Sequence, residues 1–175
     1  MEAKLLNRNA VGVDINPQSI SISKNNLHFQ CETISKVYVR QGNATNLEFI
    51  KDGKIDFICM HPPYANIINY SKDITGDISL LGTEDFLYEM GKVASESYRV
   101  LKKGKICAVM IGDIRRYGKV IPLGFKLMNT FLEQGFFAKE IIIKEQHNCR
   151  ATAYWENQNN NFLLLAHEYI FVFQK

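Results

Sequence analysis

Two hydrophobic periods alternate along this chain and predict strands and helices in turn. Short apolar or alternating runs predict strands at residues 10–15, 36–40, 55–60, 105–111, 136–144 and within 162–173. Helical spacing of apolar positions predicts helices at residues 3–9, 19–29, 83–101 and 122–134. The last two strands are close in sequence, which favours an antiparallel hairpin. The remaining order favours a largely parallel α/β sheet covered by helices on both faces.

Several local features of these elements lead to specific expectations. Thr83 is the expected N-cap of the longest helix, with Phe86 at the capping-box position, and Gly104 is expected to end that helix. Leu5 and Leu6 are expected on the buried side of the first helix.

Three polar features follow predicted strands directly: Asp14, Asn43 and the segment His61-Pro62-Pro63-Tyr64. Ligands of open α/β sheets bind beyond the carboxyl ends of the strands, where the strand order reverses. These features therefore mark the candidate functional edge of the sheet.

Composition indicates one ordinary globular domain, with 175 residues of which 46% are hydrophobic. No apolar run approaches the ~18 residues of a membrane span, and the N-terminus lacks a signal peptide, so we expect a cytoplasmic protein and no membrane partner. The four cysteines are far apart, which argues against a zinc site. Cys59 and Cys107 lie in apolar runs and are expected to be buried.

The net charge of +3 permits a nucleic-acid partner but does not by itself indicate one. Two basic clusters stand out, Lys102-Lys103-Lys105 and Arg115-Arg116 with Lys119. Either cluster could instead be a solvated turn beside a strand.

The segments around Asp14 and Asn43 each allow two interpretations. Asp14 could accept hydrogen bonds from the ribose hydroxyls of a nucleoside cofactor, or it could cap a helix. Gly42-Asn43-Ala44 could bring backbone and an amide to an adenine edge, or it could be a plain turn.

The segment 61–64 is more specific, because two prolines after a buried strand fix a rigid turn. An exocyclic base amine is a poor nucleophile, since its lone pair is delocalised into the ring. Acceptors on its N–H groups, here the Pro62 carbonyl and the His61 side chain, favour the form whose lone pair can attack a methyl group. The Tyr64 ring could stack on a base taken out of its helix. The alternative is a stiff turn with a packed tyrosine.

His61-Pro62-Pro63-Tyr64 resembles the (Asp/Asn/Ser)-Pro-Pro-(Tyr/Phe) signature of S-adenosylmethionine-dependent amino-methyltransferases that act on adenine N6 or cytosine N4 in DNA. Residues 11–17 resemble the second strand of that family, and residues 42–44 its adenine-contacting Gly-Asp-Ala segment. The resemblance implies a Rossmann-like class I methyltransferase fold for residues 1–175, and DNA methylation of the kind found in restriction-modification. It also implies cofactor contacts from Asp14, Ile15, Asn16, Gly42, Asn43 and Ala44.

The chain departs from that family in three respects. His61 replaces Asp, Asn or Ser, and it can accept a hydrogen bond only when neutral, so we expect activity to fall at acidic pH. Asn43 replaces the usual Asp. The family's first strand and glycine-rich loop are absent, which would leave two sheet edges unpaired. We therefore expect a truncated or late-started product, or a sheet completed by a partner chain or a second copy.

Further polar residues are candidates for substrate contact. They are Asn66, Asn69, Tyr70, Arg115 and Arg116, and also residues 146–150 with Tyr154 and Trp155. Ordinary polar loops would explain each of them equally well.

Three other functions remain open from the sequence. RNA guanine-N2 methyltransferases use a similar Pro-Pro-Tyr turn, so RNA is an alternative substrate. A non-catalytic methyltransferase-like subunit is favoured by the absent glycine loop. A hydride-transferring enzyme is disfavoured, since no Gly-x-Gly-x-x-Gly is present.

Overall fold

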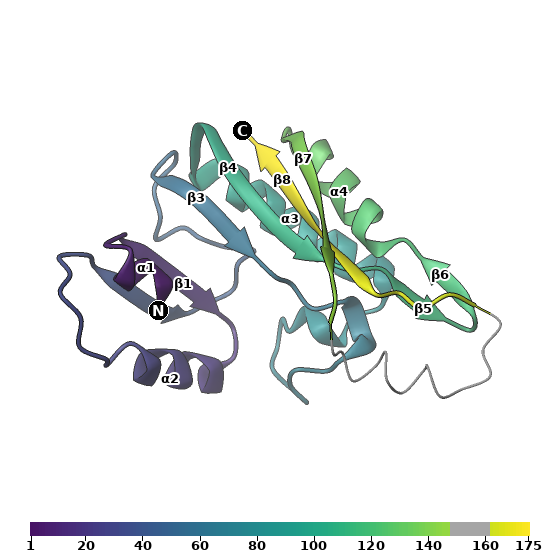
Figure 1. Ribbon diagram of the computed structural model, residues 1–175, viewed down its shortest axis with the longest axis horizontal. Helices are drawn as coiled ribbons and strands as arrows, with labels where there is room; N and C mark the ends of the chain where they lie inside the picture. The colour runs from purple at the N-terminus through teal and green to yellow at the C-terminus, as the bar shows by residue number, and fades with distance from the viewer. Residues whose placement is uncertain (148–161) are drawn as a thin grey trace.

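The computed structural model describes residues 1–147 and 162–175, which alternate strands and helices from end to end (Figure 1). The helices are α1 (Glu2–Leu5), α2 (Pro17–Asn26), α3 (Thr83–Val100) and α4 (Leu123–Glu133), with single 3-10 turns η1 (Ala65–Ile67) and η2 (Ile78–Leu80). The strands are β1 (Ala10–Asp14), β2 (Val37–Gln41), β3 (Ile55–Met60), β4 (Leu101–Ile111), β5 (Ile114–Arg116), β6 (Lys119–Ile121), β7 (Phe137–Glu145) and β8 (His167–Gln174).

The larger sheet has four strands in the order β3-β4-β8-β7. β3 runs parallel to β4, with Ile58 opposite Cys107 and Met60 opposite Val109. β8 runs antiparallel to β4 and also to β7, so the predicted C-terminal hairpin is confirmed. The described elements therefore have the mixed α/β organisation of a Rossmann-like sheet.

β1 and β2 form a separate two-stranded parallel sheet. Figure 1 shows the arrowheads of β1, β3 and β4 pointing the same way, although β1 and β3 are not paired. Within residues 1–147 and 162–175, β1 pairs only with β2, and β3 pairs only with β4. Each of these two strands therefore keeps one edge of backbone donors and acceptors without a strand partner.

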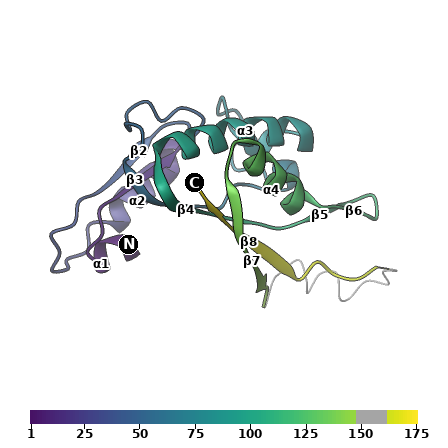
Figure 2. The ribbon, with the colours of Figure 1, turned by 90° about the horizontal axis from the view of Figure 1, so that it is seen from above.

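The hydrophobic core lies between the four-stranded sheet and the helices α3 and α4, which cover one of its faces (Figure 2). The predicted stripe of α3 is in this core, since Phe86, Met90 and Val93 are buried. Phe131 of α4 stacks on Phe173 of β8, with ring centroids 4.8 Å apart. This aromatic contact joins the helical layer to the centre of the sheet.

The expectation that helices cover both faces is wrong for the described part of the chain. On the uncovered side Phe57 is 58% exposed, and Ile142, which lies opposite Ile170, is 47% exposed. Cys59, on β3, is also exposed, contrary to expectation, whereas Cys107 of β4 is fully buried. Burial differs because Cys107, opposite Ile58, lies on the face that α3 and α4 cover, whereas Cys59, opposite Ala108, lies on the other face (Figure 2).

Three other local expectations are also wrong. Gly82, not Thr83, is the N-cap of α3. Gly104 does not end that helix, because α3 passes directly into β4 at Leu101 and Gly104 lies inside the strand with φ 76°. Leu5 and Leu6 are exposed, because α1 is a single turn of four residues with no buried face. None of the helices among the described residues is both long and apolar enough to cross a membrane.

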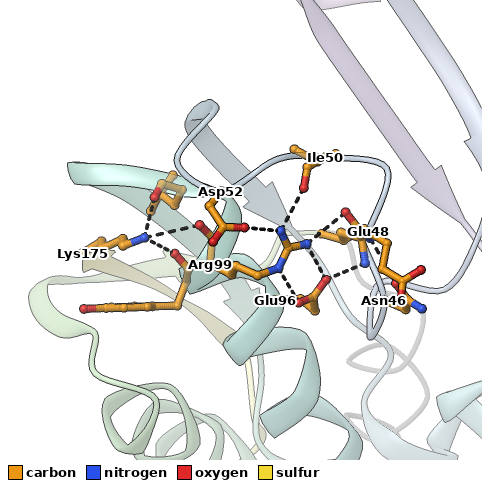
Figure 3. A network of polar contacts seen from close by, with 10 residues as sticks. Asn46, Glu48, Ile50, Asp52, Glu96, Arg99 and Lys175 are labelled. Atoms are coloured by element: carbon orange, nitrogen blue, oxygen red, sulfur yellow. Dashed lines mark hydrogen bonds and ion pairs between the residues drawn. The ribbon is translucent and has the colours of Figure 1, made fainter.

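Arg99, near the end of α3, holds the loop that leads from β2 to β3 (Figure 3). Its guanidinium donates to the Ile50 carbonyl at 2.9 Å and the Leu47 carbonyl at 3.0 Å. It also pairs with Asp52 and Glu96, each at 2.7 Å. The planar fork of five donors suits this role, and the contacts attach the chain between the two sheets to the helical layer.

Two helical glycines give a matched test of the packing. A Cβ at Gly124 would lie 2.6 Å from Cδ2 of Tyr169, whose ring is stacked on Phe171, whereas a Cβ at Gly91 would meet Thr130 at an ordinary 3.6 Å. We expect Gly124→Ala to lower the free energy of unfolding by about 1–3 kcal/mol through overpacking. Gly91→Ala should raise it by about 0.5–1 kcal/mol, the helix preference for alanine. Urea unfolding of both variants measures this, and equal effects would contradict the packing at α4.

Candidate active site

The segment His61-Pro62-Pro63-Tyr64 leaves the carboxyl end of β3 and turns sharply at Ala65. Pro62 and Ala65 are buried, and Ala65 has φ 48°, in the left-handed region that non-glycine residues rarely adopt. Backbone strain of this kind persists only where the surroundings enforce it. The turn therefore places His61 and Tyr64 in a fixed geometry at the end of the strand.

The Tyr64 side chain is held by Glu168 and Gly112, and Lys144 in turn holds Glu168. Its hydroxyl donates to Oε1 of Glu168 on β8, and the second oxygen of that carboxylate pairs with Lys144 on β7. Its ring lies against Gly112, just after β4, where a Cβ would be only 3.0 Å from the Tyr64 Cε2 atom. Any larger residue at position 112 would therefore push the Tyr64 ring away by a few tenths of an ångström.

His61 lies at the open end of the same cluster. Its Nε2 is 3.1 Å from the Tyr64 hydroxyl oxygen and 3.9 Å from Oε1 of Glu168. The two rings are tilted, with centroids 5.6 Å apart. The His61 side chain is 48% exposed, so it can reach a ligand outside the cluster.

Charge and burial define the protonation of the cluster. Burial alone would raise the pKa of the Glu168 carboxyl, but hydrogen bonds from Lys144 and Tyr64 outweigh it and hold that pKa below its ordinary value. Burial raises the pKa of the Tyr64 hydroxyl far above its ordinary value, and the hydrogen bond to charged Glu168 raises it further, although the Gly112 amide opposes this. Glu168 is therefore an anion and Tyr64 keeps its proton.

The first group of cofactor candidates lies at the end of β1. Asp14 accepts the Asn16 amide through Oδ1 at 2.8 Å, and its Oδ2 has no hydrogen-bond partner in the described chain. Asn16, not Asp14, caps α2, by accepting from the Gln18 amide at 2.8 Å. The Ile15 carbonyl accepts from Gln41 at 3.3 Å. One Asp14 oxygen thus remains available to a ligand.

The second group lies at the end of β2, next to the first. The Gly42 amide donates to the Asp14 carbonyl at 3.0 Å, which joins the two strand ends. Asn43 accepts the Thr45 amide through its side chain at 3.0 Å, and Ala44 packs on the edge of the core. The structure therefore brings together all six residues expected at the cofactor, at adjacent strand ends.

The loop that follows the segment 61–64 reaches both of these groups. Gly76, with φ 87°, lies so close that a Cβ there would be 3.0 Å from Ile15 Cδ1 and 3.1 Å from Asn43 Nδ2. Asp77 orders this loop by accepting from Ser71 at 2.5 Å and from the Ser79 amide at 2.8 Å. The loop that follows Tyr64 therefore reaches the ends of β1 and β2.

Among the substrate candidates, the loop residues Asn66, Asn69 and Tyr70 are exposed. Arg115 and Arg116 lie on a hairpin of β5 and β6 that the sequence analysis did not predict. Arg115 is engaged within the protein, donating to the carbonyls of Gly118 at 3.0 Å and Leu163 at 2.9 Å.

Arg116 has no partner among the described residues, so it differs from Arg115. Beside it, Tyr117 at the hairpin tip is fully exposed at 101%. Lys102 of the other basic cluster pairs with Asp56 at 2.8 Å. Of the candidates at 146–150 and 154–155, only Gln146 and His147 lie within the described residues.

Four residues of the site were missed from the sequence: Gly76, Gly112, Lys144 and Glu168. One signal existed for Glu168, since it is a carboxylate at the start of the apolar run that forms β8. Such a residue is rarely buried without a partner, so it could have been marked as part of a polar cluster. The two glycines matter because a Cβ at either position would approach the Tyr64 ring or the Ile15 and Asn43 side chains, and these approaches could not be predicted from the sequence.

Comparison with known proteins identifies the family. Residues 55–175, more than half of the chain, match the model of the DNA methylase family. The chain belongs to that family. The match begins at β3 and includes the segment 61–64 and the hairpin of β7 and β8. S-adenosylmethionine is the cofactor of such methyltransferases.

Individual relatives support the same fold. The orphan methyltransferase M.BamHII of Bacillus amyloliquefaciens is 26% identical over 128 residues, which are 73% of this DNA methylase chain and 41% of the relative. A Thermus thermophilus protein assigned as a DNA modification methylase, and crystallised with S-adenosyl-L-methionine, is 23% identical with a TM-score of 0.56 over 77% of this chain and 51% of that one. The chain thus spans about half the length of these relatives.

Two further structures extend the comparison. The cytosine-N4-specific PvuII DNA methyltransferase is 15% identical, with a TM-score of 0.59 over 76% of this chain and 47% of that one. A SAM-dependent methyltransferase from Methanosarcina mazei is 15% identical, with a TM-score of 0.66 over 99% of this chain and 85% of that one. These matches confirm the Rossmann-like class I methyltransferase fold.

The charge of Glu168 leads to a pH-dependent prediction for this methylase. Its pKa is lower in the folded chain than in the unfolded chain, so the carboxylate stabilises the fold at neutral pH, and this contribution is lost as the pH falls through the folded-state pKa. We expect Glu168→Gln to make the free energy of unfolding less dependent on pH below about pH 5. Urea unfolding at a series of pH values measures the slope.

Glu133→Gln, at an exposed position of α4, serves as the matched control for the loss of one carboxylate. The control should keep the slope of the unsubstituted protein. If Glu168→Gln keeps that slope too, the carboxylate is not held by Lys144 and Tyr64 as described.

Proposed function

We propose that this chain forms most of the catalytic domain of a methyltransferase that moves a methyl group from S-adenosylmethionine to an exocyclic amine of a DNA base, adenine N6 or cytosine N4. The observation that carries the proposal is the rigid turn 61–64, which presents His61 and a fixed Tyr64 and is followed by a loop whose Gly76 lies against Ile15 and Asn43 at the ends of β1 and β2. Membership of the DNA methylase family supports this choice of substrate.

The residues of the turn have distinct roles in this reaction. The cofactor supplies a methyl group bound to a sulfonium sulfur. The Pro62 carbonyl and His61 accept hydrogen bonds from the base amine, which orients its lone pair toward that methyl group. After the methyl group has been transferred, the amine nitrogen is positively charged and must lose a proton, which a neutral His61 can accept. Pro63 keeps the turn rigid, because its ring fixes φ.

Tyr64 provides a flat surface for the base. Gly112 supports one face of its ring, and Glu168 fixes the hydroxyl, so the ring keeps its orientation without a ligand. A base flipped out of the duplex loses stacking energy, which an aromatic side chain can restore. Asn66, Asn69 and Tyr70 are exposed on the loop that follows and would contact the flipped nucleotide.

The cofactor candidates fit the nucleoside part of S-adenosylmethionine. The unpartnered Oδ2 of Asp14 can accept from ribose hydroxyls, while Ile15 and Asn16 lie beside it. Gly42, Asn43 and Ala44 at the next strand end would contact the adenine, with the loop at Gly76 closing the same region. The open edges of β1 and β3 lack the backbone that would enclose the rest of the ligand.

A strand from outside residues 1–175 would complete this arrangement by pairing with both β1 and β3. It would come from a longer form of the chain, from a second copy or from a partner protein. The support for this is the unpaired edges, together with exposed apolar side chains on β1 and β3 such as Val11 and Phe57. A glycine-rich loop after that strand would supply amides to the ligand.

The hairpin of β5 and β6 is the proposed contact to the DNA backbone. Arg115 anchors it to Leu163, which leaves Arg116 and Lys119 to approach phosphates. Tyr117 and Gly118 form its two-residue turn, both with positive φ, and project the tyrosine into solvent.

Transfer of labelled methyl groups tests the proposed reaction. A form of the protein that supplies the strand between β1 and β3 should methylate DNA and leave tRNA unlabelled. Tyr64→Ala should reduce the rate by about 100-fold or more, because the base loses its stacking surface and its place beside the acceptors. Tyr88→Ala, on the exposed side of α3, is the matched control and should retain the rate.

The modified nucleoside in the product distinguishes N6-methyladenine from N4-methylcytosine by mass spectrometry. Label in tRNA instead of DNA would favour the RNA guanine-N2 alternative. No transfer to either nucleic acid would favour a non-catalytic subunit, and each of these outcomes would contradict the proposal.

Binding of the cofactor tests the proposed completion of the sheet. We expect the 175-residue chain alone to bind S-adenosylmethionine weakly, because the backbone between β1 and β3 is not provided by the described residues. Titration calorimetry should show a dissociation constant far above ~1 μM, the value that corresponds to a binding free energy of about −8 kcal/mol. Low-micromolar binding by this chain would contradict the need for a further strand.

A further inference from the structure

A chain of four polar side chains crosses the sheet at the candidate active site. Lys144 of β7 pairs with Oε2 of Glu168 on β8, and Oε1 of Glu168 accepts the hydroxyl of Tyr64. The Tyr64 oxygen lies 3.1 Å from Nε2 of His61. Two strands and the turn after β3 therefore contribute to the surroundings of one imidazole nitrogen.

Proton counting fixes the direction of these hydrogen bonds. Glu168 is paired with an ammonium group, so it is charged and can only accept. The hydroxyl of Tyr64 has one proton, and it donates that proton to Glu168. In its contact with His61 the Tyr64 oxygen must then accept, which requires a proton on Nε2. The negative Oε1 of Glu168, 3.9 Å from Nε2, favours the same placement.

We propose that Glu168 is a positioning residue that acts through the Tyr64 hydroxyl to keep the proton of neutral His61 on Nε2, which leaves Nδ1 as the acceptor for the substrate amine. The proposal rests on the proposed function for the identity of that amine. The placement of the proton itself rests on the geometry of His61, Tyr64 and Glu168.

This placement matters because the two nitrogens of a neutral imidazole exchange roles between tautomers. An Nδ1–H group would point a donor at the N–H groups of the base and would oppose binding of the amine. In the described residues nothing hydrogen-bonds to Nδ1 of His61, and its side chain is half-exposed. Nδ1 is thus available to a ligand, while Nε2 is occupied.

The tautomer can be measured on the 175-residue chain without cofactor or DNA. Nitrogen-15 NMR distinguishes protonated from unprotonated ring nitrogens of His61, at a pH where the ring is neutral. We expect Nε2–H in the unsubstituted protein and in Glu168→Gln, whose amide oxygen still accepts from Tyr64. In Glu168→Ala the Tyr64 hydroxyl has no carboxylate and turns to donate to Nε2, so the proton should move to Nδ1.

A double variant separates this effect from a loss of structure. Adding Tyr64→Phe to Glu168→Ala removes the competing donor and keeps the ring, so Nε2–H should return. Circular dichroism and thermal unfolding verify that the variants are folded. An unchanged tautomer in Glu168→Ala, or no recovery in the double variant, would overturn the proposal.

Methyl transfer by the form with a completed sheet provides a second readout. We expect Glu168→Ala to reduce the rate by about 100-fold, Glu168→Gln to retain most of it, and the double variant to exceed Glu168→Ala. If Glu168→Ala and Glu168→Gln lose activity equally, the proposal fails. If the tautomers change as described but no protein transfers methyl groups, the placement of the proton is supported and the proposed function fails.

Discussion

The pairing of β4 with two neighbours of opposite direction is the constraint on which the site depends. β3 runs parallel to β4 and ends beside Val109, whereas β8 runs antiparallel and begins beside Ile111. The end of one strand and the start of the other therefore reach the same edge of the sheet. For this reason Tyr64 and Glu168, 104 residues apart in sequence, are hydrogen-bonded. A parallel partner in the place of β8 would have put its first residues at the opposite edge.

The second constraint is the break between β1 and β3. Strand pairing does not connect the two sheets within the described residues, so the connecting chain is held by other contacts: the amides of Gly53 and Lys54 donate to the carbonyls of Arg99 and Val100, and side chains add to these. Arg99 fixes the loop from Leu47 to Asp52 on α3 (Figure 3), and Gly76 brings the loop after the turn against Ile15 and Asn43. A strand inserted between β1 and β3 would form hydrogen bonds with the unpaired edge of each. Both of these contacts could remain in place beside it. The ends of β1 and β2 and the loop that follows the turn 61–64 are thus in contact, although no strand pairing joins β1 to β3 in the described residues.

Much of this fold could be predicted from periodicity, because an element that packs in the core carries apolar residues at regular spacing along its own sequence. β3 was found to the residue because it is a short apolar run that ends at two prolines, and the stripe of α3 matches the core because that helix has one apolar face. The exposure of Cys59 was not predictable, because it depends on which face of the sheet the helices cover and not on the strand itself. The hairpin of β5 and β6 was missed because it is short and its turn contains Tyr117 at positive φ, where glycine or asparagine is the usual signal.

The chemistry of the segment 61–64 could also be predicted only in part. The sequence identifies His61 as an acceptor that replaces the usual Asp, Asn or Ser, but an imidazole differs from these groups in an important way. A carboxylate, amide or hydroxyl oxygen always has a lone pair to offer, whereas each imidazole nitrogen is a donor in one tautomer and an acceptor in the other. A histidine at this position therefore needs a second group to choose the tautomer. In this structure that group is Glu168, which acts through Tyr64. Because the Tyr64 hydroxyl donates to Glu168, its oxygen accepts from Nε2 of His61. The histidine at the first position of the motif therefore depends on the buried Glu168 of β8, because Glu168 determines which ring nitrogen of His61 carries the proton.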